Sequence, residues 1–96
     1  MNNFKFEVEL DEEIPDKYSI CLIDNDGFCY MDVDIAEQLH IPLKEYEDIL
    51  KKNEAIVMHN FYSQWFEDTR YLFDTEIQAK NAIKELKKLE GGIVNG

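Results

Sequence analysis

The first chemistry to consider is calcium binding, because four carboxylates crowd around one glycine: Asp24, Asp26, Gly27, Asp32 and Asp34. An EF-hand loop with Gly27 at its central glycine needs an acid at position 22 and a bidentate glutamate at position 33. The chain has Leu22 and Val33 there. The pattern therefore predicts turn and helix-cap residues, with weak, non-specific cation binding as the alternative.

The histidines and cysteines do not have the spacing of a transition-metal site. His40 and His59 lie nineteen residues apart, and Cys21 and Cys29 lie eight apart without a C-x-x-C motif. We expect the two cysteines to be small core residues that remain thiols in a reducing compartment, with a disulfide between them as the alternative. No metal or cofactor is predicted.

Nucleophilic catalysis has no better candidate. Ser19 falls inside an apolar stretch typical of a strand, and Ser63 lacks the glycines of a nucleophile elbow. Carboxylate pairs carry little information in a chain of 96 residues with 21 acids. The sequence predicts a protein that is not an enzyme, and an uncharacterised enzyme is the least favoured alternative.

Aromatic residues concentrate in one segment, where thirteen residues hold six of the aromatic side chains: Phe61, Tyr62, Trp65, Phe66, Tyr71 and Phe73. The first four fall where a connection between two strands should be polar. Tyrosine and tryptophan often dominate the energy of protein interfaces. We predict that Phe61, Tyr62, Trp65 and Phe66 anchor a protein partner, with core packing as the alternative.

Negative charge is the second feature that points to a partner. Residues 1–50 hold 14 acids and three lysines, whereas residues 51–96 hold seven acids and seven bases, so the first half carries the whole net charge of −11. Such a field repels phosphate backbones and anionic membranes and favours a basic protein surface. The acids predicted to steer that partner are Glu12, Glu13, Asp16, Asp24 and Asp26. Solubility alone is the alternative role.

Composition predicts one small globular domain over residues 1–96. The chain is 45% hydrophobic, which is enough for a core, although a thin one at this length. It contains no apolar stretch of membrane-spanning length and no secretory signal pattern. We therefore expect a cytoplasmic protein.

The sequence of the N-terminal half predicts three strands. Residues 4–10 alternate apolar with charged side chains, which is typical of a half-buried strand. Residues 18–23 and 28–31 are β-prone, and Asp24 to Gly27 between them form a turn sequence, so the pair predicts a hairpin.

The remaining elements are two short helices, two strands and a long helix. Asp34 and Glu37 form a capping box that starts a helix ending near His40, and a second helix follows Pro42. The other predicted elements are strands at 55–60 and 69–73 and a helix after the capping box Thr75–Gln78, which ends at Gly91–Gly92. The order β-β-β-α-α-β-β-α predicts an α+β fold with one antiparallel sheet of about five strands and helices on one face.

The helix pair at residues 34–50 resembles the helix-turn-helix of bacterial and phage DNA-binding proteins. The matching positions are Ala36, Leu39, Ile41 and Ile49, and the turn has His40 where the motif usually has glycine. This resemblance implies a small DNA-binding accessory regulator. A recognition helix here would present three acids and one base to the DNA, as Lys44, Glu45, Glu47 and Asp48.

The preferred prediction is a non-enzymatic acidic module that binds a basic protein surface. In size and charge the chain resembles small acidic phage products, among them anti-CRISPR and anti-restriction proteins. That resemblance implies an inhibitor whose carboxylates replace the phosphates of a nucleic acid. A single arginine among ten bases argues against direct recognition of nucleic acid.

Overall fold

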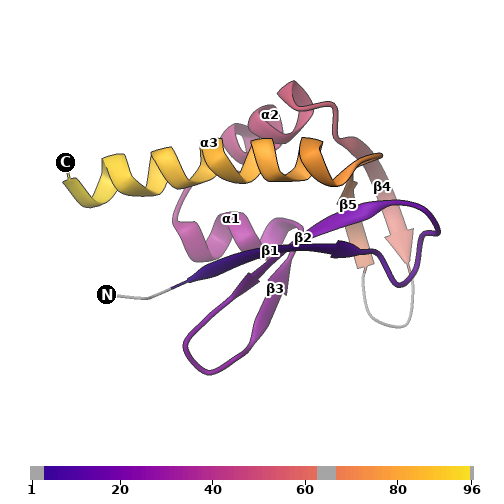
Figure 1. The fold of residues 1–96 in the computed structure, drawn as a ribbon, viewed down its shortest axis with the longest axis horizontal. Helices are drawn as coiled ribbons and strands as arrows, with labels where there is room; N and C mark the ends of the chain where they lie inside the picture. The colour runs from indigo at the N-terminus through magenta and orange to yellow at the C-terminus, as the bar shows by residue number, and fades with distance from the viewer. Residues whose placement is uncertain (1–3, 63–66, 96) are drawn as a thin grey trace.

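A computed structural model describes residues 4–62 and 67–95, which fold into three helices and five strands (Figure 1). The elements are, in order, β1 (Lys5–Leu10), β2 (Tyr18–Ile23), β3 (Cys29–Met31), α1 (Val33–Leu39), α2 (Leu43–Lys52), β4 (Ile56–Tyr62), β5 (Glu67–Leu72) and α3 (Glu76–Asn95). The predicted α+β class and element order are confirmed.

The strands form two antiparallel sheets, so the prediction of one five-stranded sheet is wrong. One sheet has the order β1-β2-β3 and the other is the β4-β5 hairpin. They meet at an isolated bridge, in which Tyr18 and Phe73 exchange backbone hydrogen bonds of 2.8 and 2.9 Å. The ladder does not continue. Tyr71 has the next N–H on the same edge of the chain as that of Phe73, and this N–H donates to the carboxylate of Asp32 at 3.0 Å.

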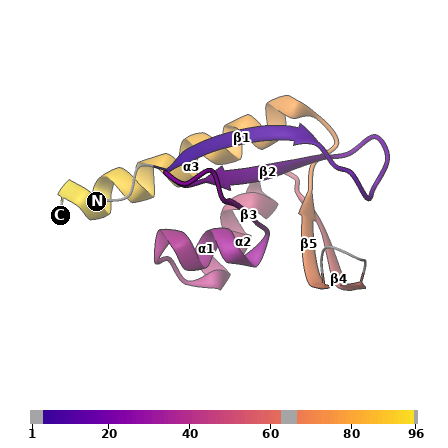
Figure 2. The same ribbon diagram turned by 90° about the horizontal axis from the view of Figure 1, so that it is seen from below.

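The core lies between the three-stranded sheet and the helices (Figure 2). Ile20 and Leu22 point inward from β2 and are at most 4% exposed. The helices contribute the other large part of this cluster: Ile35, Ala36, Leu39, Tyr46, Leu50, Ala79, Ala82, Ile83 and Leu86. Because side chains alternate along a strand, Ser19 and Cys21 face away from this core and are nevertheless buried.

The ends of the helices test the predicted caps. The box Thr75–Gln78 is confirmed, since the Thr75 N–H donates to the Gln78 side chain at 3.1 Å and the Gln78 N–H donates to Thr75 Oγ1 at 3.3 Å. The box at Asp34 is wrong, because α1 begins two residues after Met31 and its N-cap is Asp32. The carboxylate of Asp32 makes no cap bond, since it accepts from β5 instead.

Two element ends lie beyond their predicted positions. α3 continues through Gly91–Gly92 to Asn95, because glycine inside a helix costs only about 1 kcal/mol and does not forbid it. β4 continues to Tyr62, which pairs with Glu67 after a bulge between Met58 and Phe61. The first two aromatic residues of the predicted connection are therefore strand residues.

The two cysteines form a disulfide, so the prediction of two thiols is wrong. In the ladder Cys21 pairs with Met31 and Cys29 with Ile23, which places both cysteines on the same face, two pairing steps apart. Their Cα atoms are 6.1 Å apart, within the span that a disulfide needs. The register that brings them together depends on the hairpin, which the cysteine spacing alone does not give.

Replacing both cysteines by alanine is expected to lower the free energy of unfolding by roughly 2–3 kcal/mol. The disulfide closes a loop with a sequence separation of 8, and loop-closure entropy sets this magnitude. Urea unfolding with and without reductant measures it. The double alanine variant is the control, since reductant should leave its midpoint unchanged; an equal response of both proteins to reductant would contradict the assignment.

Candidate functional site

A cavity of about 460 Å³ opens on the side of the three-stranded sheet that Glu9, Ser19 and Met31 share. Ser19 lies directly opposite Glu9 in the β1-β2 ladder, and opposite residues project to the same face. We call this cavity the carboxylate pocket. It is lined by Glu9, Asp11, Glu12, Ser19, Phe28, Cys29, Met31 and Asp34.

The charge of the carboxylate pocket has one sign. Four carboxylates line it, and no lysine or arginine of the described ranges 4–62 and 67–95 does. Glu9, Glu12 and Asp34 are exposed, and none of the three forms an ion pair with another described residue. A cation that enters the pocket is therefore attracted by several carboxylates at once.

Asp11 differs from the other three because it is bound to a buried arginine. Arg70 has no exposed surface, and its guanidinium spans the carboxylates of Asp11 and Asp32. Its Nε donates to Asp32 at 2.9 Å, and its two terminal nitrogens donate to Asp11. These contacts join the β1-β2 connection, the start of α1 and β5, so the cluster fixes three distant segments around one cation.

The pKa values of the two carboxyls of the cluster are shifted in opposite directions. Burial raises the pKa of Asp11, but bonds from Arg70 and from the N–H groups of Ile14 and Glu13 outweigh it, so the pKa lies below its usual value. For Asp32 burial dominates the bonds from Tyr71 and Arg70, and the pKa lies above its usual value. Asp11 is therefore held ionised, facing Arg70.

Asp11 also fixes the backbone beside the pocket. Its Oδ2 accepts hydrogen bonds from the N–H groups of Glu13 at 2.9 Å and Ile14 at 2.8 Å. These bonds set the turn that carries Glu12, so the position of this exposed acid is tied to the buried cluster. The ring of Phe61 also contacts Arg70, with its centroid 5.7 Å from the guanidinium carbon.

Ser19 is the unusual member of the pocket. It is 1% exposed, and its Oγ has no hydrogen-bond partner among the described residues. An unpartnered buried hydroxyl costs about 1–3 kcal/mol, so natural proteins rarely leave one without a role. This hydroxyl adds a free acceptor beneath the exposed carboxylates.

The predicted steering acids separate into two groups. Glu12 lines the carboxylate pocket, and the half-buried Glu13 and the exposed Asp16 lie in the same connection. Asp24 and Asp26 lie in the β2-β3 turn, at the opposite end of β2 (Figure 1). A strand of six residues spans about 20 Å, so the structure does not bring all five together.

Acids from both the turn and the pocket contribute to a raised pKa of Tyr30. Burial raises the pKa of its hydroxyl first, followed by the bond that it donates to Asp24 at 3.0 Å and by the charges of Asp24, Asp26 and Asp34. Asp34 also lines the carboxylate pocket. The acids of the turn and of the pocket therefore act on the same side chain.

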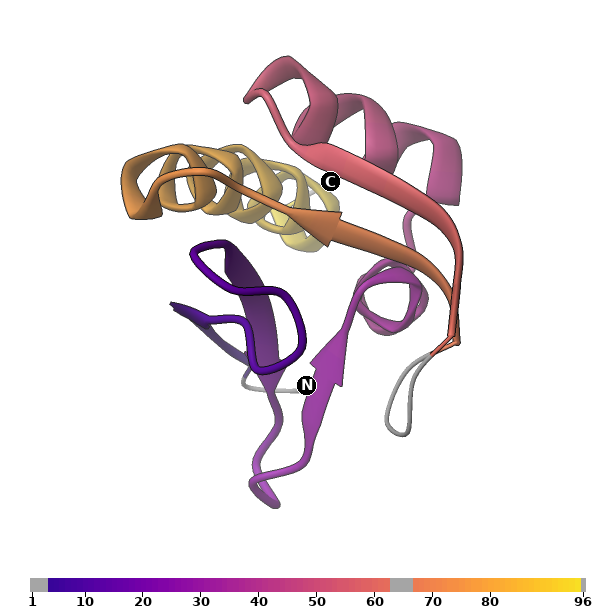
Figure 3. The same cartoon turned by 90° about the vertical axis from the view of Figure 1, so that its right-hand side faces the viewer.

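The predicted aromatic anchor is divided in the same way. Phe61 is half-buried against Arg70, whereas Tyr62 is 71% exposed at the end of β4. Trp65 and Phe66 lie outside the described residues. Figure 1 places the β4-β5 hairpin and the 11–17 connection toward the same end of the long axis, but Figure 3, which looks at that end, shows them on different sides of it.

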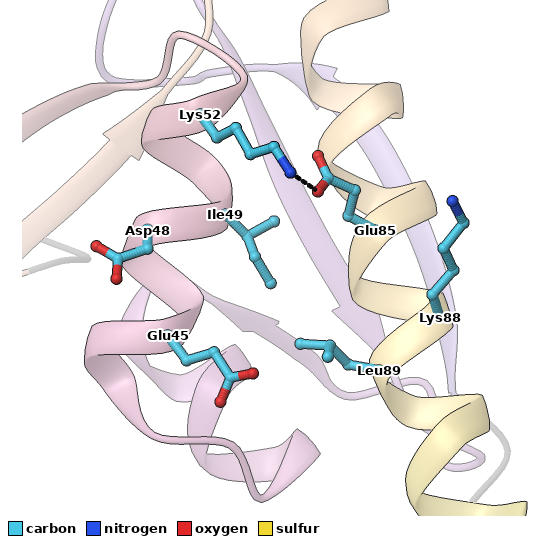
Figure 4. A pocket seen from close by; sticks show the side chains of 7 residues that line it. All are labelled: Glu45, Asp48, Ile49, Lys52, Glu85, Lys88 and Leu89. Atoms are coloured by element: carbon cyan, nitrogen blue, oxygen red, sulfur yellow. Dashed lines mark hydrogen bonds and ion pairs between the residues drawn. The ribbon is translucent and has the colours of Figure 1, made fainter.

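A second cavity, of about 350 Å³, lies between α2 and α3 (Figure 4). Its lining carries both signs of charge, and Lys52 donates to Glu85 at 3.0 Å across it. Glu85 also accepts from Asn53 at 2.7 Å, which, ahead of Lys52, lowers the pKa of this carboxyl. Its charges are matched internally, so this groove makes a poorer site for a charged ligand.

The helix pair that resembles a helix-turn-helix is present as α1 and α2, and His40 adopts the left-handed conformation, with φ 58°, where the motif usually has glycine. The outer face of α2 is acidic or neutralised. Lys44 pairs with Asp48 at 3.1 Å, and Lys51 pairs with Glu47 at 3.0 Å. This face offers little free positive charge to a phosphate backbone.

Sequence reasoning missed Glu9, Ser19, Asp34 and the Arg70 cluster as parts of one site. Ser19 was the available signal, because it is a polar residue inside the apolar stretch of β2. Arg70, the one arginine of the chain, was another, because arginine is rare inside a strand of a small core.

Three further properties of the chain concern metal binding, membranes and known relatives. Within the described ranges, no three His, Cys, Asp or Glu side chains are arranged to hold a metal ion. None of the helices in that part of the chain has the length and apolar character needed to cross a membrane. Comparison of the chain with protein-family models, curated proteins and solved structures finds no match.

Proposed function

We propose that this chain is a non-enzymatic protein-binding module that docks on a basic surface of a partner protein. One observation carries the proposal: the carboxylate pocket gathers Glu9, Glu12 and Asp34 without a compensating base from the described residues. Complementary charge of this kind speeds association and selects the partner. The proposal also includes Tyr62, an aromatic side chain that is 71% exposed at the end of β4.

The position of the lysines supports the same proposal. Lys80, Lys84 and Lys87 line a groove between α3 and β1, away from the carboxylate pocket. Others pair with acids near them, as in Lys17 with Asp74 at 3.1 Å and Lys52 with Glu85 at 3.0 Å. In this proposal the carboxylate pocket, whose lining has four acids and no base of the described residues, is the part of the surface that attracts a basic partner.

A narrower form of the proposal is an inhibitor that occupies a surface where the partner normally binds nucleic acid. Carboxylates would then take the place of phosphates. This form requires that nucleic acid and the chain compete for one partner, which distinguishes it from docking elsewhere on the partner.

Two matched variants test the proposal. The pocket variant is Glu9→Gln, Glu12→Gln, Asp34→Asn. The control variant removes the same charge from the α2 side, as Glu45→Gln, Asp48→Asn, Glu54→Gln. Each protein is immobilised and exposed to a nuclease-treated lysate of the source organism, and the captured protein is purified and titrated.

We expect the pocket variant to bind this partner about tenfold or more weakly and the control variant to bind it like wild type. Raising the salt from about 50 mM to about 500 mM should weaken the wild-type complex. Equal losses in both variants would reduce the effect to net charge, and equal binding by all three proteins would exclude the carboxylate pocket as the docking site. Competition by added nucleic acid tests the inhibitor form.

A further inference from the structure

We infer that the carboxylate pocket receives a single arginine side chain of the partner. This inference rests on the proposed function and deepens it by naming the group that enters the pocket. The carboxylates of Glu9, Glu12 and Asp34 line a cavity of about 460 Å³, within the range of sites that bind small ligands. These three carboxylates are best matched by a cation that carries several hydrogen-bond donors.

Ser19 provides an independent observation of the missing ligand. Ser19 lines the cavity, and its Oγ is buried without a partner among the described residues. A residue opposite Glu9 in the ladder projects to the same face as that glutamate, so the hydroxyl belongs to the same wall. A donor entering between the two would satisfy the hydroxyl and neutralise the acid at once.

The remaining lining favours a guanidinium over an ammonium. Phe28 and Met31 give the cavity an apolar side, and Phe28 is 59% exposed, with its ring held edge-on against Tyr30 at 4.7 Å between centroids. A guanidinium stacks on such a ring and still directs its N–H donors to carboxylates in its plane. Lysine offers a compact charge and three donors without a flat face.

The chain already contains one instance of this recognition. Arg70 lies between the carboxylates of Asp11 and Asp32, with the ring of Phe61 at 5.7 Å. The carboxylate pocket combines the same groups in its lining, several acids and one aromatic ring, that of Phe28. A bare metal ion fits it less well, since no three His, Cys, Asp or Glu side chains of the described residues are placed to hold one together.

The test uses acetyl-Gly-Arg-Gly-amide as the probe, titrated into isotope-labelled protein and followed by amide chemical shifts. The matching lysine and citrulline peptides are the controls for shape and charge. We expect saturable shifts at Ser19, Phe28 and Met31 with the arginine peptide, weaker ones with lysine and none with neutral citrulline. The pocket variant should abolish them, and the control variant should retain them.

Ser19→Ala gives a second, separate readout. We expect it to weaken the arginine peptide about tenfold, because a hydrogen bond to a charged group is lost. We expect its thermal midpoint to stay equal or rise, because the substitution removes a buried hydroxyl without a partner. A fall in the midpoint with unchanged peptide affinity would assign Ser19 to the fold and overturn its role here.

Other results would overturn the inference as a whole. Shifts that spread over the acids of α2 as much as over the pocket, or that never saturate, would show diffuse charge attraction. If the pocket variant loses the partner while wild type ignores the arginine peptide, the arginine assignment fails and the proposed function stands. If the peptide binds in the pocket but the pocket variant keeps the partner, the proposed function fails.

Discussion

Arg70→Met is expected to lower the free energy of unfolding by about 3–5 kcal/mol, the largest loss from any single charged residue of this chain. Arg70 is fully buried, and the substitution would leave Asp11 and Asp32 side by side without their shared cation. Two carboxylates that are shielded from water repel each other strongly. Urea unfolding of the purified variant measures the loss.

A triple variant separates lost pairing from lost packing. The variant Arg70→Met, Asp11→Asn, Asp32→Asn removes all three charges of the cluster. Each asparagine keeps a side-chain oxygen that can accept the backbone hydrogen bonds now made to Asp11 and Asp32. We expect it to recover most of the stability, because replacing a whole buried ion cluster is often nearly neutral. If the free energy of unfolding of Arg70→Met lay within about 1 kcal/mol of the wild-type value, the structural role of the cluster would be contradicted.

The buried cluster also marks the limit of what the sequence could predict. Thr75 and Gln78 lie three residues apart, so their reciprocal cap bonds follow from local spacing and were predicted correctly. Asp32 also precedes a helix, but its side chain is drawn to Arg70, 38 residues away. A local cap rule cannot anticipate such a long-range partner, which is why the cap was placed at Asp34.

The candidate site was predictable in kind but not in composition. The excess of acids in residues 1–50 was visible in the sequence, and Glu12 does line the carboxylate pocket. Glu9, Ser19 and Asp34 meet there only because β1, β2 and the start of α1 lie side by side, which depends on strand register. Asp24 and Asp26 lie at the opposite end of β2 because the whole strand separates them from the 11–17 connection.

The end of β4 lies later in the chain than predicted for a related reason. Aromatic residues favour strands as much as interfaces, and here Phe61 and Tyr62 extend β4 past the bulge at Met58. Phe61 then packs over Arg70, while Tyr62 remains exposed. Whether an aromatic side chain fills a core or faces a partner depends on which neighbour reaches it, and sequence spacing does not supply that neighbour.

Phe73 determines how the two sheets are held together. Its side chain is fully buried, and its N–H and C=O form the bridge to Tyr18 at 2.9 and 2.8 Å. The bridge is the point where the β4-β5 hairpin meets the three-stranded sheet. If this junction carries the cooperativity of the fold, damage to the ring must destabilise both sheets at once.

We expect Phe73→Ala to lower the free energy of unfolding by about 3–5 kcal/mol, because it leaves a cavity where core side chains from β2 and α3 converge. The control is Ile77→Ala, whose side chain is 70% exposed and whose loss should cost no more than about 0.5 kcal/mol. Far-ultraviolet circular dichroism and tyrosine fluorescence should report one coincident transition in both variants. Separate transitions in Phe73→Ala would mean that the two sheets fold independently, and a loss equal to that of Ile77→Ala would remove Phe73 from the core.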